Sequence, residues 1–348
     1  MSTDPADRPG PHRVDPGRER HERGGPVASE LTRLLRSSSY SQRMSRFALA
    51  LVSPTFLVVA LVVVVPFFWT LFLALTDVRL IDLPDTHLFN ADYTVDNVTR
   101  VLSSANFWES AVVTVCYTFF GTVGSVAVGL VAALALRRAF PGRALLRSLV
   151  LVPFAVPVVA AALVWQTALD PQFGFVNAAG QRWLGWEEPV LFLSQRMAHP
   201  SVLGVTVPVP VALLTVIAFE VWRSFAFSFL FLLARLQAVN GELVEAARID
   251  GAAPSQVFRH VVLPQLAGVI SLLLMLRAIF IFQNFTDIYL LTGGAGGTQV
   301  LSVQVYEYLT ARSDLGGASA LGLVMAAAMG VLLVGYIWRT EPRSGRRA

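Results

Sequence analysis

Residues 243–264 read LVEAARIDGAAPSQVFRHVVLP and form the most specific pattern in this chain of 348 residues. The first part suits a short helix with two adjacent alanines, and such small side chains let another backbone approach closely. Asp250-Gly251 is a typical turn sequence. A second short helix is expected from about Pro254 to Val261, and Pro264 suits the first position of a new helix, where no N–H donor is needed. The pattern predicts a helix–turn–helix elbow.

The elbow lies between two of six long apolar segments. These segments are expected at about residues 47–75, 109–136, 145–169, 205–233, 265–285 and 317–338. Each supplies the roughly 20 residues with which a helix crosses the hydrocarbon of a bilayer. Overall, 55% of the residues are hydrophobic and 14% are charged, whereas a soluble domain has about 45–50% and about 25%. The sequence predicts an all-α, polytopic membrane protein with six transmembrane helices, and it argues against a soluble enzyme.

The segments outside the six-helix domain, residues 47–338, are polar. Residues 1–46 are rich in Pro, Gly, Arg, Asp and Ser, a composition that predicts a largely disordered tail. Residues 235–264 hold the elbow, and residues 339–348 form a short C-terminal tail.

Arginine supplies all 27 basic residues, and its distribution predicts the orientation. Nine arginines lie in the N-terminal tail, four between Arg137 and Arg147, three in residues 235–264 and four after Trp338, which makes twenty. Only five lie in the other loops. The positive-inside rule therefore places both termini and the elbow in the cytoplasm. Because the arginines are divided among loops instead of forming one basic face, a nucleic-acid partner is not predicted.

The sequence offers no catalytic pattern. A phosphate-binding loop of the Gly-x-x-x-x-Gly-Lys type needs a lysine, and the chain has none. The histidines and the single cysteine, Cys116, do not have the spacing of metal ligands. We therefore expect no enzymatic activity, no metal and no cofactor in this chain.

The elbow resembles the signature of the membrane subunits of binding-protein-dependent ABC importers. The shared features are Glu-Ala-Ala, a glycine after three intervening residues, nine more residues and then Val-x-Leu-Pro. Pro153-x-x-x-Pro157, followed by Trp165, Pro171, Gly174 and Asn177, resembles the third span and its exit in carbohydrate permeases. Residues 285–294, FTDIYLLTGG, resemble the fifth-span exit in the first permease of maltose, trehalose and glycerol-phosphate importers. The resemblance covers most of the chain from about residue 47 onward.

This resemblance implies the type I ABC importer permease fold in a bacterial plasma (inner) membrane. It further implies import of a sugar or related polyol that an external solute-binding protein delivers. The implied partners are a second, non-identical permease subunit and two ATP-binding subunits, which use ATP and Mg. In this family the elbow is the coupling loop that seats in a cleft of the ATP-hydrolysing subunit. The implied coupling residues are Glu245, Ala246, Ala247, Asp250, Gly251, Ala252, Leu263 and Pro264.

Three charged residues, Glu220, Arg223 and Arg277, fall near the middle of the fourth and fifth spans, where charges are costly and usually functional. In a structural interpretation, Glu220 is neutralised by an arginine and the cluster locks two helices together. In a functional interpretation, the charges line a polar cavity and bind a hydroxylated solute. The family resemblance favours the second interpretation. The candidate solute-binding residues are Glu220, Arg223, Ser224, Phe227, Arg277, Phe280, Ile281 and Asn284.

Arg277 departs from the family, since the maltose relative has a small hydroxyl side chain there. It would narrow the cavity or suit an anionic or smaller solute. Three alternatives to a sugar importer remain open. The first is an ABC permease for a non-sugar solute. The second is an ion-coupled secondary transporter, which would need coupling-ion ligands and usually inverted repeats. The third is a membrane-embedded enzyme.

Overall fold

The structure, a computed structural model, describes residues 47, 51–79, 93–199, 201–202, 205–206 and 208–340. The tail predicted over residues 1–46 lies outside this part, as do residues 341–348 of the C-terminal tail. The chain divides into two compact units, Met1–Phe68 and Trp69–Ala348. Each unit is described by itself.

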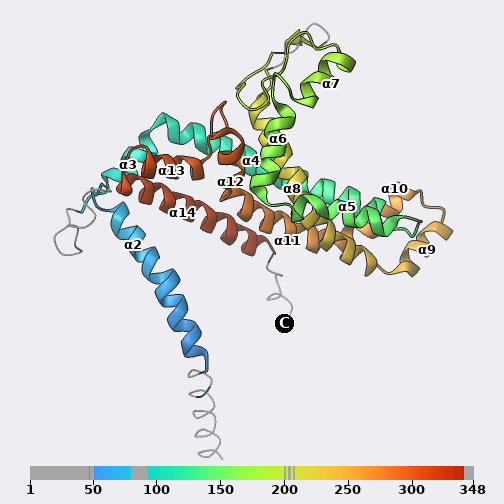
Figure 1. The fold of residues 1–348 in the computed structure, drawn as a ribbon. Coiled ribbons are helices and arrows are strands. Elements are labelled where there is room, and N and C mark those ends of the chain that lie inside the picture. Colours follow the sequence, from blue (N-terminus) through green and yellow to red (C-terminus); the bar gives the residue numbers. More distant parts are fainter. Residues whose placement is uncertain are drawn as a thin grey trace, which may run out of the picture. The chain divides into compact units, whose positions relative to one another are not determined.

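The described residues are almost entirely helical, as the sequence predicts (Figure 1). The α-helices are α2 (Val65–Ala74), α3 (Asp96–Ser103), α4 (Ala105–Ala135), α5 (Arg143–Ala155), α6 (Val158–Leu169), α7 (Phe175–Leu184), α8 (Val211–Gln237), α9 (Gly241–Ile249), α10 (Pro254–Val257), α11 (Leu263–Phe282), α12 (Thr286–Thr292), α13 (Leu301–Thr310) and α14 (Leu315–Thr340). Two π-helical turns, η1 (Ala60–Val64) and η3 (Phe258–Val262), interrupt longer helices. Strands β1 (Ser201–Val202) and β2 (Val205–Thr206) form a small antiparallel hairpin in which Ser201 pairs with Thr206.

Among the described residues, five helices are long and apolar enough to cross a membrane. They are Leu51–Ala74, Ala105–Ala135, Val211–Gln237, Pro254–Phe282 and Leu315–Thr340. A sixth span results if α5 and α6 are counted as one broken span.

Prolines break the third predicted span and delay the start of the fourth. The span expected over residues 145–169 is two helices, α5 and α6, with 96° between them. Val156, which precedes Pro157, has φ −72° and ψ 133°, since a residue before proline is pushed out of the helical region. The fourth span begins at Val211 instead of residue 205, where β2 and two prolines, Pro208 and Pro210, occupy the expected start.

The fifth span begins earlier than predicted and does not start afresh at Pro264. The helix runs without a break from Pro254 to Phe282. Its π-helical turn η3 ends at Val262, two residues before Pro264, and the Leu263 N–H that follows it donates to the Phe258 carbonyl. Such a turn is a common adjustment where the regular hydrogen-bond ladder loses a donor.

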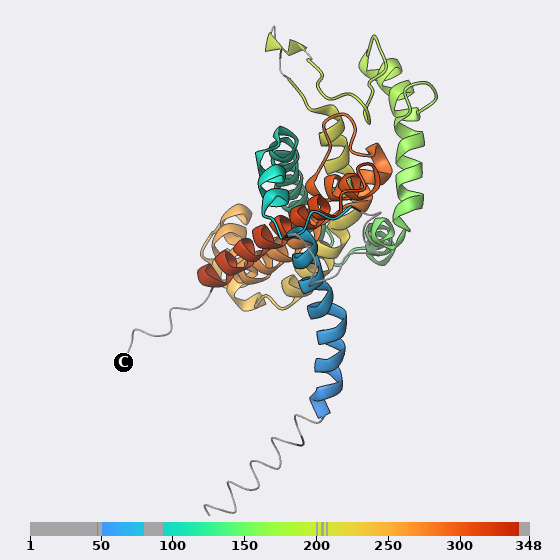
Figure 2. The same ribbon diagram turned by 90° about the vertical axis from the view of Figure 1, so that its left-hand side faces the viewer.

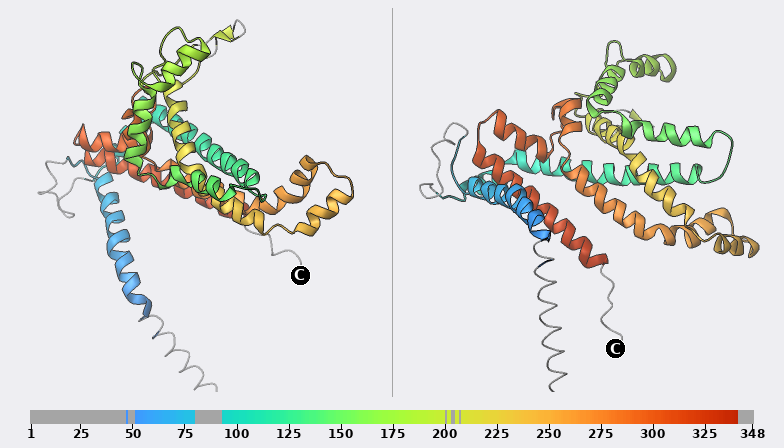
Figure 3. Two further views of the ribbon diagram at one scale, coloured as in Figure 1. Left: turned by 45° about the vertical axis from the view of Figure 1, so that its right-hand side comes forward. Right: turned by 60° about the horizontal axis from the view of Figure 1, so that its bottom comes forward.

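Helix α4 packs along α8 and α11, and these three helices form the centre of the Trp69–Ala348 unit (Figure 3). Its buried face is mostly small or polar, with Ser110, Thr114, Tyr117, Thr118, Gly121, Thr122, Ser125, Gly129 and Ala133 beside the apolar Phe107 and Val126. Its exposed face is apolar, with Trp108, Val112, Val115, Phe119, Phe120, Val123 and Val131. This polarity suits a lipid environment, where small and hydroxyl-bearing residues mediate helix contacts. At Gly129 an added Cβ would lie only 2.7 Å from the Ser228 Cβ, so α4 and α8 approach closely there.

The two ends of this unit carry different features. Helices α9 and α10 form the elbow beyond the ends of α8 and α11, while α12 and α13 lie at the opposite end (Figure 1). In the view of Figure 2, α6 leads away from the central helices to α7. Gln166 on α6 donates to the carbonyl oxygen of Leu290 at 2.8 Å and so attaches this arm to α12.

Candidate functional site

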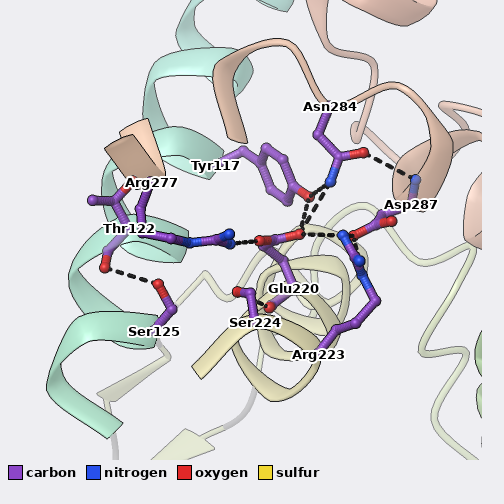
Figure 4. Close-up of polar contacts among 9 residues, drawn as sticks. All are labelled: Tyr117, Thr122, Ser125, Glu220, Arg223, Ser224, Arg277, Asn284 and Asp287. Atoms are coloured by element: carbon purple, nitrogen blue, oxygen red, sulfur yellow. Dashed lines mark hydrogen bonds and ion pairs between the residues drawn. The ribbon is translucent and has the colours of Figure 1, made fainter. Parts of the chain in front are cut away.

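A buried polar network joins four helices near the middle of the Trp69–Ala348 unit (Figure 4). Tyr117 comes from α4, Glu220 and Arg223 from α8, Arg277 from α11 and Asp287 from α12. Asn284 lies in the short connection between α11 and α12. Glu220 and Arg223 are three residues apart, so they share one face of α8 and can approach the same partners.

Glu220 is the centre of this network, and its side chain is only 1% exposed. One carboxylate oxygen, Oε1, accepts a hydrogen bond from Arg277. The other oxygen, Oε2, accepts from the Asn284 amide at 3.0 Å and from the Tyr117 hydroxyl at 3.4 Å. Arg223 Nη2 lies 3.5 Å from the same oxygen. Both carboxylate oxygens of Glu220 are therefore engaged within the chain.

Asp287 completes the network from the far side of Arg223. Its Oδ2 accepts from Arg223 Nε at 3.1 Å and lies 3.0 Å from Nη2. The Asp287 backbone N–H donates to Asn284 Oδ1 at 3.2 Å, which fixes the orientation of that amide. Two carboxylates and two guanidinium groups thus balance to zero net charge, the condition under which buried charges are tolerable.

Two members of the network keep some access to the surroundings. The Arg223 side chain is 28% exposed, and Asn284 is half-buried. Arg277 is buried, and its Nε has no hydrogen-bond partner among the described residues. The network can hold α8, α11 and α12 together, and it presents polar groups at one edge.

The other predicted solute-binding residues are dispersed around the network. Ser224 is buried and donates to the backbone carbonyl of Glu220 at 2.6 Å. Ile281 is buried in an apolar cluster with Val216, Phe219 and other residues. Phe227 packs between Phe154 and Phe231, with ring centroids 6.3 Å and 4.9 Å away. Phe280 is 59% exposed. The structure therefore brings Glu220, Arg223, Arg277 and Asn284 into one network and places these four elsewhere.

Sequence reasoning missed two members of the network. Asp287 belongs to the segment that resembles the fifth-span exit and is not among the predicted solute-binding residues, yet it is buried and forms the shortest contacts of Arg223. Tyr117 lies in a span otherwise rich in Val and Phe. A usable signal for Asp287 was its charge within three residues of Asn284, because a carboxylate at the end of an apolar span needs a partner.

The elbow has a well-defined turn that explains its glycine. The Ala252 N–H donates to the Ala247 carbonyl and the Gly251 N–H to the Arg248 carbonyl, both at 3.0 Å. These two bonds form a Schellman motif, which requires a left-handed residue after the helix. Gly251 supplies it with φ +82°. The helix start is capped by Asn240, whose side chain accepts from the Glu242 N–H at 2.9 Å.

One face of the elbow packs against the ends of the long helices, and the other face is exposed. Val244, Val257 and Val262 are buried in a cluster with the ends of α4 and α8. The predicted coupling residues divide accordingly: Glu245, Ala246, Asp250, Gly251 and Pro264 are exposed, and Ala247, Ala252 and Leu263 are partly buried. Ile249 is 82% exposed although it is apolar. An added Cβ at Gly251 would meet nothing within 4 Å, so this turn faces open space.

A comparison with known protein families identifies the family of this chain. Residues 125–343 match the family described as binding-protein-dependent transport system inner membrane component. The chain belongs to this family of ABC transporter permeases, which confirms the resemblance first seen in the elbow.

Curated relatives are similar over most of the chain. The inner membrane ABC transporter permease protein YcjO of Escherichia coli is 34% identical over 231 residues, which are 66% of this chain and 74% of that protein. The trehalose/maltose transport system permease protein MalF of Thermococcus litoralis is 32% identical over 291 residues, which are 83% of this chain and 91% of that protein.

A solved structure confirms the fold. A chain of a bacterial alginate ABC transporter, crystallised with an alginate pentasaccharide-bound periplasmic protein, aligns with a TM-score of 0.71. The alignment covers 87% of this chain and 96% of that chain at 20% identity. The predicted ABC importer permease fold is therefore correct.

Proposed function

We propose that this chain is a permease subunit of an ATP-driven importer for a sugar or related polyol. The observation that carries the solute class is the similarity to the trehalose/maltose permease of Thermococcus litoralis over 83% of the chain. The trehalose permease SugA of Mycobacterium tuberculosis, 28% identical over 84% of the chain, supports the same class.

The residues of the network have two roles in this proposal. Arg223 and Asn284 lie at its accessible edge. The Arg223 guanidinium donates to solute hydroxyls. The Asn284 amide nitrogen is already committed to Glu220 and Tyr117, so Asn284 accepts from a solute hydroxyl through Oδ1. The exposed ring of Phe280 offers an apolar surface to a sugar ring. Glu220, Arg277 and Asp287 position these groups from behind. Ser224 is hydrogen-bonded to the Glu220 carbonyl, and Phe227 and Ile281 pack in two separate apolar clusters. The two interpretations of the charged cluster thus apply to different members of it.

The elbow couples the chain to a separate ATP-hydrolysing subunit. The docking role is supported by the Glu-Ala-Ala…Gly pattern of the elbow and by its geometry, since the turn at Gly251 faces open space and Ile249 beside it is exposed. ATP and Mg belong to that subunit, and no cofactor is assigned to this chain. A second permease subunit, two ATPase subunits and an external solute-binding protein complete the importer. Both termini and the elbow lie on the cytoplasmic side of the inner membrane, in keeping with the arginine distribution.

The decisive experiment is solute uptake into proteoliposomes that contain the assembled importer and its binding protein. Enclosed ATP should drive uptake of a labelled disaccharide, and ionophores that collapse ion gradients should leave that uptake unchanged. Complete loss of uptake with ionophores at constant ATP would instead identify an ion-coupled transporter. If a panel of sugars fails to bind the receptor while another solute class binds, the chain remains an ABC permease but the sugar assignment fails.

A further inference from the structure

Four arginines lie in the connection after α4 and in the first turns of α5, and the structure divides them into two pairs: Arg137 and Arg138 in the connection, and Arg143 and Arg147 in α5. Arg147 Nη2 donates to the Leu136 carbonyl at 2.8 Å, and Arg143 Nη1 donates to the Arg137 carbonyl at 3.4 Å. These two side chains satisfy carbonyl groups at the C-terminal end of α4, where cations are favourable. They thereby hold the connection in a fixed conformation.

The other pair faces the elbow. Arg137 and Arg138 line a groove of about 680 Å³ whose opposite wall is α9, with Gly241, Val244, Glu245, Arg248 and Ile249. Arg138 is exposed and Arg137 is half-buried. Within the described part of the chain, neither guanidinium has a carboxylate within ion-pair distance, and the same is true of Arg248. The groove therefore holds three unpaired cations and one carboxylate.

We propose that this groove receives an acidic segment of the ATP-hydrolysing subunit, so that the α4–α5 connection is a second docking element beside the elbow. The proposal rests on the proposed function, because it takes α9 as the element that the ATPase contacts. Any protein that covers the exposed Ile249 on α9 also covers the groove. Three guanidinium groups buried beneath such a partner need compensating carboxylates, since an unpaired charge in an interface is costly.

Anionic lipid is a less suitable occupant of the groove. The Glu245 carboxylate on the α9 wall would repel a phosphate group, whereas a protein segment can place its carboxylates beside the arginines alone. Val244 and Ile249 add apolar surface to the groove. A polar lipid headgroup gains no favourable contact with such apolar side chains. A peptide segment with acidic and apolar side chains matches both properties.

The absence of lysine from the chain permits a direct test. Arg138→Lys introduces the only side-chain amine, and a zero-length carbodiimide joins an amine only to a carboxylate in contact with it. In the assembled importer, Lys at this position should form an amide with an Asp or Glu of the ATPase subunit, identified by mass spectrometry. The wild-type chain controls for the N-terminal amine. Arg339→Lys, an exposed position at the end of α14, controls for chance collisions on the same side.

A second measurement addresses affinity. The double variant Arg137→Glu/Arg138→Glu should weaken ATPase binding on the order of tenfold at low salt and flatten its salt dependence, because interfacial charges mainly steer association. Ile249→Asp serves as the test of the elbow itself. If Ile249→Asp releases the ATPase but neither arginine experiment has an effect, this inference fails and the proposed function stands.

Two other results would also overturn the inference. If Ile249→Asp leaves the ATPase bound as well, the elbow is not the docking element and the proposed coupling fails too. If the double variant leaves ATPase affinity unchanged but lowers binding to phosphatidylglycerol vesicles, the groove binds lipid.

Discussion

The charge network around Glu220 and the elbow around Gly251 differ in where their partners come from. Every charged group of the network is paired inside the chain, across α8, α11 and α12. In the elbow and the facing groove, Arg137, Arg138 and Arg248 form no ion pair with any residue that the structure describes, and Ile249 is exposed. The charges of the network are therefore paired within one chain, whereas the elbow and the groove leave charged and apolar side chains available for contacts with a partner.

The two regions therefore have different roles in the protein. A charge-balanced network of ion pairs fixes the relative positions of helices, and it can change only if its pairs exchange. An exposed surface on a hydrogen-bonded turn, such as the one at Gly251, can transmit the movement of a docked partner to the helices without a change in its own conformation. We expect changes in the network to affect stability first and changes in the elbow to affect assembly first.

Glu220→Ala should have the largest effect on stability. It leaves the Arg277 guanidinium buried without its carboxylate, and breaking a buried ion pair in this way costs about 3–5 kcal/mol. The thermal unfolding temperature of the purified importer should fall strongly, and the amount of inserted chain should fall with it.

Glu245→Ala is the matched control, because this glutamate is exposed and has no ion pair among the described residues. Its unfolding temperature should stay at the wild-type value. If Glu220→Ala unfolds at the wild-type temperature while uptake is lost, the network does not hold the helices and Glu220 serves the solute directly.

Gly251→Val should have the next largest effect, this time on coupling. A β-branched residue at φ +82° strains the turn by about 1–2 kcal/mol, and its side chain extends toward the docking partner. ATP hydrolysis should no longer be stimulated by the loaded binding protein, although the chain inserts normally.

Gly251→Asn separates the two causes, since asparagine tolerates the left-handed conformation. Loss of stimulation in this variant would point to a clash with the partner, and recovery would point to strain alone. Full activity of both variants would refute the coupling role of the turn.

Much of the fold could be predicted from the sequence because lipid imposes simple rules. Long apolar runs specify spanning helices, and the elbow could be recognised because its turn needs a glycine at one position. The positions of prolines predicted the ends of helices less reliably. Pro157 ends α5 with a 96° bend, yet Pro264 is accommodated within a continuous helix by a π-helical turn. The outcome depends on neighbouring hydrogen bonds, which a sequence does not display.

The network could be predicted only in part for a different reason. The spacing of Glu220 and Arg223 on one helix is a local property, so their proximity follows from the sequence. The pairing of Arg223 with Asp287 and the contact of Tyr117 with Glu220 depend on how α4, α8 and α12 are rotated against one another. Among the candidates, Phe227 and Ile281 illustrate the same point, because they lie in packed apolar clusters.

Ile249→Ala should have a moderate effect that is confined to assembly. Because the side chain is 82% exposed, the free energy of unfolding should change by less than about 0.5 kcal/mol. Affinity for the ATPase subunit should fall by about 1–2 kcal/mol if the side chain fills a pocket there. Calorimetric titration of the permease with the isolated ATPase measures the difference, with Leu243→Ala, on the same helix and 53% exposed, as the comparison. Equal ATPase affinities of the wild-type chain, Ile249→Ala and Leu243→Ala would contradict a docking role for this surface.

Ser224→Ala should have the smallest effect and tests the network at its margin. The hydroxyl donates to the Glu220 carbonyl of its own helix, and such back-bonding adds little to helix stability. The free energy of unfolding should change by less than about 1 kcal/mol, and the KM for solute uptake should stay at its wild-type value.

Arg223→Lys, at the accessible edge, is the comparison for Ser224→Ala. It should raise the KM in the same assay because a lysine cannot reproduce the forked guanidinium contacts. A raised KM for Ser224→Ala with no change for Arg223→Lys would reverse the assignment, moving the solute to the inner side of the network.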